Sequence, residues 1–129
     1  MKNSAPVAGQ RRGVCVLYTG GTMGMRRTGD RGSLAPAKGY LTEQIREHIS
    51  ELKAETMPSI DVVEFDELLD SSDFGPTQWA EIASQINQRY DSYDGFVVIQ
   101  GTDTMAYTAS ALSFMVRRSC VVRAQGRTK

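Results

Sequence analysis

The sequence predicts an α/β fold with a doubly wound parallel sheet, in which helices cover both faces of the strands. Two short apolar runs, at residues 14–18 and 96–99, suit buried strands. A third strand is expected at residues 60–66, and helical segments separate the three strands. With 129 residues, of which 40% are hydrophobic and 23% charged, the chain suits one globular domain.

The first half of the chain begins with the strand at 14–18, which ends in the turn Thr19-Gly20-Gly21. An irregular segment at 24–39, rich in Gly and Pro, follows and predicts a functional lid or a disordered loop. A helix is expected from about 41 to 54, because apolar residues recur there every three or four positions.

The second half begins with a helix at 76–90, which opens on a proline and carries one apolar stripe. A strand at 95–99 and a helix of small residues at about 106–116 follow. Residues 120–122 form only a doubtful fourth strand. Without such a strand the apolar edge of 95–99 stays unpaired, so we expect a marginally stable chain that aggregates.

The charges divide the chain into three parts. Residues 1–13 and 117–129 carry three and five bases and no acid, whereas residues 14–116 hold all 15 acids and seven bases, a net charge of −8. We therefore expect a basic N-terminal tail at 1–13, an α/β domain at 14–116 and a basic tail at 117–129. An acidic body with two short basic ends does not indicate nucleic-acid binding.

Apolar runs and cysteines bear on the cellular location. The longest uninterrupted apolar run has five residues, too few to cross a membrane, and residues 1–13 lack the apolar core of a secretory signal. The two cysteines, Cys15 and Cys120, cannot form a disulfide framework. We expect a reduced, cytoplasmic protein with no membrane partner.

Clusters of Gly, Ser, Thr and Asp follow the three strands, at 19–24, 70–73 and 100–104. Parallel sheets bind ligands beyond the carboxyl ends of their strands, so these clusters mark the candidate site. In the first cluster, glycines permit a sharp turn and an activated threonine hydroxyl could act as a nucleophile, with a plain tight turn as the alternative. The spacing does not fit a phosphate-binding loop.

The other two clusters also have two interpretations each. Asp70-Ser71-Ser72-Asp73 precedes a predicted helix, so it is either a helix cap or a cradle for a small carboxylate. Asp103, between Thr102 and Thr104, is either an N-cap or an acid that holds an ammonium group. Three such clusters at successive strand ends favour an enzyme that acts on a small polar zwitterion.

Metal binding has little support in the sequence. One histidine and two distant cysteines give no zinc-ligand spacing. His48 falls near the apolar stripe of the first helix, so we expect it to be a partly buried packing residue.

At its three clusters the sequence resembles the asparaginase family. Residues 18–25 (YTGGTMGM) are similar to the first family signature, and residues 70–74 (DSSDF) to the loop that binds the substrate carboxylate. Residues 94–110 (DGFVVIQGTDTMAYTAS) are similar to the second signature. Within these motifs, DGF and MAY resemble the cytosolic type I bacterial L-asparaginases in particular.

The resemblance implies that L-asparagine is hydrolysed to L-aspartate and ammonia without a metal or an organic cofactor, in a homo-oligomer. Thr22 matches the threonine nucleophile that forms an acyl-enzyme. Thr102 and Asp103 match the second threonine and the acid of a catalytic Thr–Asp–Lys set, and both belong to the substrate site. Asp103 matches the contact to the substrate ammonium group, and Ser71 and Ser72 match contacts to its α-carboxylate.

Two departures from the family pattern add further expectations. Residues 32–36 (GSLAP) lack the lid tyrosine that often hydrogen-bonds the nucleophile in the family. Family chains continue past residue 116 with a catalytic lysine and a second domain, which residues 117–129 do not resemble. We therefore expect a truncated chain that is inactive alone and does not form proper homo-oligomers. The alternative is a non-catalytic remnant that at most binds a small amino acid.

Overall fold

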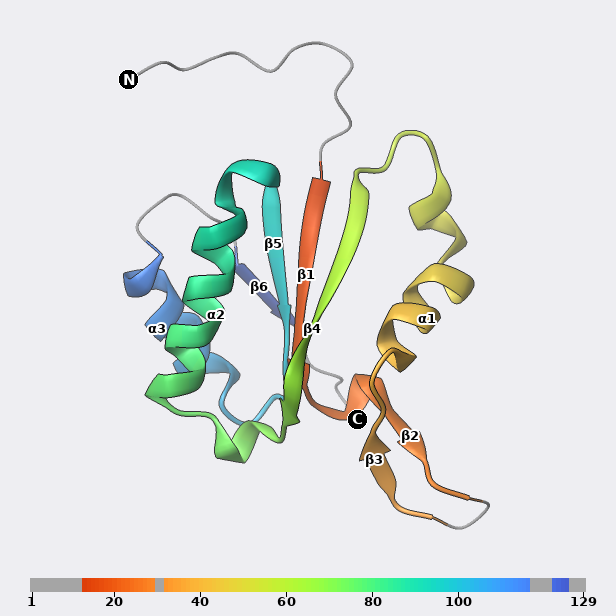
Figure 1. Ribbon diagram of the computed structural model, residues 1–129, viewed down its shortest axis with the longest axis horizontal. Coiled ribbons are helices and arrows are strands. Elements are labelled where there is room, and N and C mark those ends of the chain that lie inside the picture. Colours follow the sequence, from red (N-terminus) through yellow and green to blue (C-terminus); the bar gives the residue numbers. More distant parts are fainter. Residues whose placement is uncertain (1–12, 30–31, 117–121, 126–129) are drawn as a thin grey trace.

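The computed structural model describes residues 13–29, 32–116 and 122–125 (Figure 1). Within these ranges the main sheet is fully parallel and has the strand order β4-β1-β5-β6. Its strands are β1 (Gly13–Gly20), β4 (Ser59–Leu69), β5 (Gly95–Ile99) and β6 (Val122–Gln125).

Strand β1 is the centre of the sheet. It pairs with β4 on one side and β5 on the other, so Val16 stands between Val62 and Val97. Its side chains alternate between the faces: Cys15 and Leu17 pack on one side, and Val16 and Tyr18 on the other. An apolar run buried on both faces is the sequence pattern expected of such a strand.

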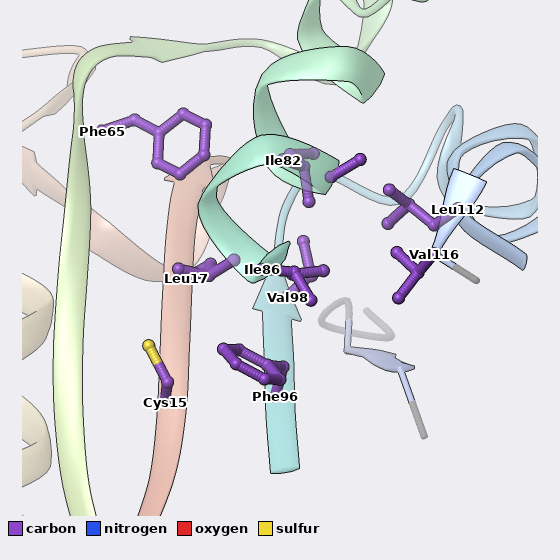
Figure 2. Close-up of a cluster of buried hydrophobic side chains, with 10 residues drawn as sticks. Cys15, Leu17, Phe65, Ile82, Ile86, Phe96, Val98, Leu112 and Val116 are labelled. Atoms are coloured by element: carbon purple, nitrogen blue, oxygen red, sulfur yellow. The ribbon is translucent and has the colours of Figure 1, made fainter. Parts of the chain in front are cut away.

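Helices cover both faces of the sheet. Helices α2 (Pro76–Arg89) and α3 (Met105–Met115) lie on one side, and α1 (Tyr40–His48) lies on the other (Figure 1). The larger core fills the space under α2 and α3, as Figure 2 shows. Its buried members are Cys15, Leu17, Phe65, Ile82, Ala83, Ile86, Phe96, Val98, Leu112 and Val116.

Short elements connect these layers. An antiparallel hairpin, β2 (Met25–Arg27) and β3 (Leu34–Pro36), extends away from the sheet between β1 and α1 (Figure 1). Single 3₁₀ turns follow β1, α1, β4 and α2: η1 (Thr22–Gly24), η2 (Ser50–Lys53), η3 (Ser71–Asp73) and η4 (Tyr90–Ser92). None of the described helices is long and apolar enough to cross a membrane.

The α/β class and the parallel sheet with helices on both faces are confirmed, but four details differ from expectation. The segment 24–39 is partly ordered as the β2–β3 hairpin, and the first helix ends at His48 before a 3₁₀ turn. His48 is exposed, so its prediction as a partly buried residue is wrong. A fourth strand is present at 122–125, where it covers the edge of β5; residues 117–121 lie outside the described ranges.

Candidate functional site

The candidate site lies where β1, β4 and β5 end. Because these strands are parallel, the loops that follow them meet at one edge of the sheet, at the lower end in Figure 1. We call them the first loop (20–24), the second loop (70–73) and the third loop (100–104). Each contains residues that the sequence singled out.

The first loop lies close to the end of β4 and to the third loop. Two glycines with positive φ make these close approaches possible. Gly20 has φ 136°, and a Cβ atom there would lie 2.0 Å from the carbonyl oxygen of Leu69. Gly21 has φ 89°, and its Cβ would lie 2.7 Å from the backbone nitrogen of Gly101. Only glycine allows both the left-handed conformation and these close approaches.

The second and third loops are also in direct contact. A Cβ atom on Gly101 would lie 2.6 Å from Ser71 Oγ, so the absence of a side chain lets the two loops touch. The hydroxyl of Thr104 donates a hydrogen bond of 2.8 Å to the carbonyl oxygen of Ser71. Gly101 therefore contacts both other loops, and the structure brings all three together.

Thr22 lies at the first position of η1 and is exposed. The residues before it are anchored in the sheet: Thr19 Oγ1 donates to the carbonyl oxygen of Ile99 at 3.1 Å, and Tyr18 Oη donates to that of Gly21 at 3.1 Å. These bonds hold the backbone before Thr22 in place, and Thr22 itself is exposed, as a nucleophile must be if a substrate is to reach it.

The second loop is both a cap and a hydroxyl cluster. Asp70 is the N-cap of η3, and its Oδ1 accepts hydrogen bonds of 3.0 Å from the backbone N–H and the hydroxyl of Ser72. These two bonds hold the pKa of the Asp70 carboxyl below its usual value. Ser71 is buried against Gly101, whereas Ser72 is exposed. The predicted cap of the helix at 76–90 is wrong, because Asp70 caps only the short turn η3 and the N-cap of α2 is Gly75. Ser71 and Ser72 stay candidate ligand contacts.

The third loop presents Thr102 and Asp103, both exposed, between β5 and α3. The N-cap of α3 is Thr104, so the alternative that Asp103 caps this helix is wrong. Thr104 does not cap with its side chain, because its hydroxyl is bonded to Ser71. The carboxylate of Asp103 is available to an ammonium group in solution.

Two polar side chains beneath these loops were not singled out from the sequence. Tyr18 belongs to the apolar run at 14–18 that predicts a buried strand, and its hydroxyl supports the first loop. Gln100 is only 3% exposed, and neither atom of its amide has a hydrogen-bond partner. Both lie where an apolar run meets a glycine turn, Tyr18 two positions before Gly20 and Gln100 directly before Gly101, and this placement is the signal that could have identified them.

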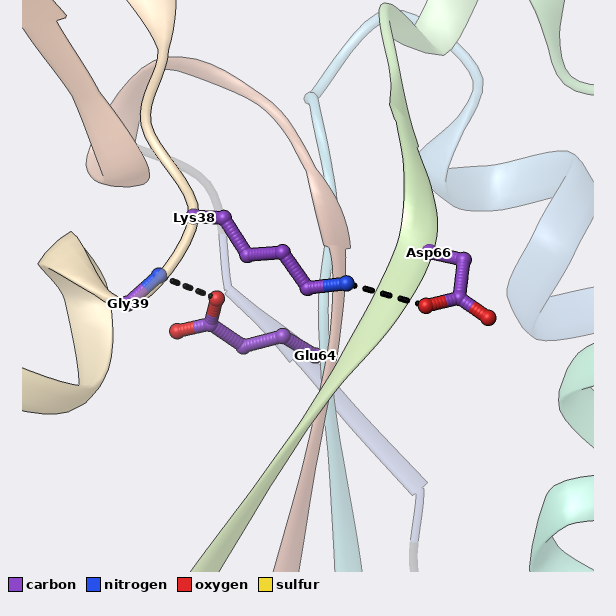
Figure 3. A network of polar contacts seen from close by, with 4 residues as sticks. All are labelled: Lys38, Gly39, Glu64 and Asp66. Carbon is purple, nitrogen blue, oxygen red and sulfur yellow. Dashed lines mark hydrogen bonds and ion pairs between the residues drawn. The ribbon is translucent and has the colours of Figure 1, made fainter.

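The described ranges contain no group of three or more His, Cys, Asp and Glu side chains that is arranged to hold a metal ion. Their two lysines also lie outside the three loops. Lys38 forms an exposed ion pair of 2.9 Å with Asp66, and Lys53 ends η2 (Figure 3 shows Lys38).

Comparison with known proteins assigns this parallel α/β domain to a family. Residues 13–123 match the family domain described as Asparaginase, N-terminal, so the chain belongs to the asparaginase family.

Individual relatives agree with this assignment. The chain is 48% identical over 107 residues to L-asparaginase 1 of Escherichia coli K12, which covers 83% of this chain and 31% of that protein. It is 38% identical over 135 residues to L-asparaginase of Dirofilaria immitis, covering 84% and 22%. The crystal structure of L-asparaginase I from Vibrio cholerae superposes with a TM-score of 0.71 at 45% identity, covering 81% of this chain and 30% of that one. The chain therefore spans less than a third of the length of these relatives.

Proposed function

We propose that the three loops bind L-asparagine and that Thr22 attacks its side-chain amide, giving L-aspartate and ammonia. One observation carries the proposal: in a member of the asparaginase family, Gly101 brings the loops of Thr22, Ser71 and Asp103 into direct contact. These are the residue types that a small zwitterion with an amide side chain requires.

The chemistry divides amide hydrolysis into two steps. In the first, Thr22 Oγ bonds to the amide carbon, its proton is passed on through a base, and the nitrogen leaves as ammonia. In the second, water attacks the resulting ester, releases L-aspartate and restores the threonine hydroxyl. Thr102 and Asp103 are the groups of this chain that we place beside the reacting amide.

The binding roles follow from charge. Asp103 supplies the negative charge opposite the substrate's α-ammonium group. The hydroxyls of Ser71 and Ser72 donate hydrogen bonds to the α-carboxylate, and for this the Ser72 hydroxyl exchanges its bond to Asp70 for one to the substrate. Selection of L-asparagine over other amino acids then depends on holding the α-ammonium and α-carboxylate groups while the side-chain amide points to Thr22.

A second candidate function is amino-acid binding with little turnover. It is favoured by the position of Lys38 and Lys53 away from the three loops, because the family's catalytic set includes a lysine. A single proton-transfer group contributes roughly 10²–10⁴-fold to a rate. We propose that the 129-residue chain releases at most trace ammonia, and that the complete reaction belongs to a cytoplasmic homo-oligomer.

The test is a titration of the ¹⁵N-labelled chain with L-asparagine, together with an ammonia assay. Resonances of the three loops should shift, and D-asparagine should have a weaker effect. Thr22→Ala should remove any ammonia release yet keep binding, because the hydroxyl acts chiefly in the transition state. Asp103→Asn should weaken binding, whereas the control Thr56→Ala, at an exposed threonine outside the loops, should change neither quantity.

Each result selects between the candidates. Turnover at ordinary enzyme rates that depends on Thr22 supports full activity of this chain and contradicts the proposal that it releases only trace ammonia. Binding at the loops without ammonia release supports the binding function. A folded chain that shows no shifts in the three loops, or ammonia release that persists in Thr22→Ala, contradicts the proposal.

A further inference from the structure

Tyr18 is the last large side chain of β1 before the first loop, and it is completely buried. It points to the face of the sheet covered by α1, where it packs with Val16, Leu41 and Ile99. Its ring therefore lies beneath η1, the turn that carries Thr22. A residue that served only as core packing would need no hydroxyl at this place.

The phenol oxygen contacts the backbone on both sides of Thr22. It donates a hydrogen bond of 3.1 Å to the carbonyl oxygen of Gly21, and it lies against the backbone of Gly24. The approach at Gly24 is close, since a Cβ atom there would lie 2.1 Å from the phenol oxygen. One buried hydroxyl thus joins the two ends of the turn.

The hydroxyl keeps its proton for this purpose. Burial raises the pKa of Tyr18, and the nearby charge of Glu64 raises it further, against the opposing hydrogen bond from Gly24. The phenol is therefore neutral around pH 7 and donates to the Gly21 carbonyl throughout the physiological range.

We propose that Tyr18 is a positioning residue for the nucleophile: its hydroxyl clamps Gly21 to Gly24 and so sets the position of the Thr22 hydroxyl. The inference rests on the proposed function for the role of Thr22. Tyr18 acts through the backbone and has no need to touch the substrate. A substrate that must meet Thr22 at a defined distance is sensitive to such a clamp, because small displacements of a reacting group cost much of its effect.

The experiment compares Tyr18→Phe with Tyr93→Phe. Each variant removes one hydroxyl that donates a hydrogen bond, and the Tyr93 hydroxyl bonds Asp61 Oδ2 at 3.0 Å, away from the three loops. Amide hydrogen exchange is measured for Gly24 and Thr22, and a ¹⁵N titration with L-asparagine gives both the affinity and the shift of the Thr22 resonance on binding. In Tyr18→Phe we expect Gly24 to exchange at least about tenfold faster, as for the loss of one buried hydrogen bond, and the Thr22 shift to be reduced. The affinity should stay close to that of the wild type, because the Thr22 hydroxyl acts chiefly in the transition state. In Tyr93→Phe both should stay as in the wild type.

Equal Gly24 exchange in the two variants overturns the proposal, and so does faster exchange with an unchanged Thr22 shift on binding L-asparagine. A wild-type chain that binds no L-asparagine overturns the proposed function and the role of Tyr18 with it, which separates that failure from the first two. If Tyr18→Phe does not fold, the wild type answers the question: a slowly exchanging Tyr18 hydroxyl proton with a cross-peak to the Gly24 amide supports the clamp. A rapidly exchanging hydroxyl overturns it.

Discussion

At the scale of single residues, the site depends on positions where a side chain is missing. Gly20, Gly21 and Gly101 let three backbone segments approach more closely than any Cβ atom permits. Thr22 and Asp103 are exposed, so a ligand in solution can reach them. The glycines therefore determine where the side chains of Thr22 and Asp103 lie, whereas these exposed side chains contribute little to the packing.

Gly101→Ala should disturb the site by overpacking. The added Cβ would lie 2.6 Å from Ser71 Oγ and 2.7 Å from Ser71 Cβ, so the second and third loops must move apart. We expect a loss of about 1–3 kcal/mol of unfolding free energy and weaker L-asparagine binding, measured by urea denaturation and titration. Gly95→Ala is the matched control, because nothing lies within 4 Å of a Cβ there. An equal unfolding free energy and an equal L-asparagine affinity in the two variants would show that the close contact between Gly101 and Ser71 has no such effect.

At the scale of secondary-structure elements, α1 depends on a residue from a distant strand. Its N-cap is Gly39, in the left-handed conformation and without a capping side chain. Glu64 of β4 supplies the cap instead: its carboxylate accepts bonds of 2.6 Å from the Gly39 N–H and of 2.6 Å from Thr42 Oγ1 (Figure 3 shows the first). This contact ties the helix to the sheet just after the β2–β3 hairpin.

Glu64→Gln should therefore destabilise the protein in a pH-dependent way. Burial alone would raise the pKa of Glu64, but hydrogen bonds from Thr42 and Gly39 outweigh it and hold the pKa below its usual value. A carboxylate whose pKa is lower in the folded than in the unfolded state stabilises the protein fully at pH values above the unfolded pKa of about 4.3. This stabilisation is lost as the pH falls through the folded-state pKa. We expect urea denaturation to show a deficit of up to about 1 kcal/mol at pH 7.

The same deficit should shrink as the pH falls below the ordinary glutamate value of about 4.3 and through the lowered folded-state pKa, because the wild-type carboxylate then takes up a proton itself. Glu67→Gln is the control, since Glu67 is an exposed residue of the same strand. A deficit that is constant with pH would show that shape, and not charge, gives Glu64 its effect.

At the scale of the whole molecule, the parallel sheet needs cover at its edges as well as on its faces. The edge of β5 is paired with β6, from Phe96 with Val122 to Ile99 with Gln125. The expected cause of marginal stability was an unpaired β5 edge, and the structure removes that cause. Stability of the chain in solution stays a prediction.

Deletion of residues 117–129 should reopen this edge. The backbone N–H and C=O groups of β5 would lose their partners, and an unpaired apolar strand recruits other chains. We expect a lower denaturation midpoint and larger species in size-exclusion chromatography than for the full chain. Deletion of residues 2–12 is a control of similar size, and an identical midpoint for both shortened chains would show that β6 contributes nothing to stability.

The sequence alone was sufficient for the order of the elements and for the choice of the three loops. Apolar runs and helical periodicity are local properties, so β1, β4, β5 and α2 were predicted close to their observed bounds. The assignments of Thr22, Ser71, Ser72, Thr102 and Asp103 to catalysis and binding came from the motifs and stay predictions.

Contacts between distant residues were decided only by the tertiary structure. Glu64 caps a helix that begins 24 positions before it, Thr104 bonds Ser71 across 33 positions, and β6 pairs with β5 through residues outside any recognised pattern. Local composition carries no record of such partners, because the same side chain packs, caps or binds according to what the folded chain places beside it. For that reason Tyr18 read as a core residue in the sequence, and only the folded first loop shows its hydroxyl beneath Thr22.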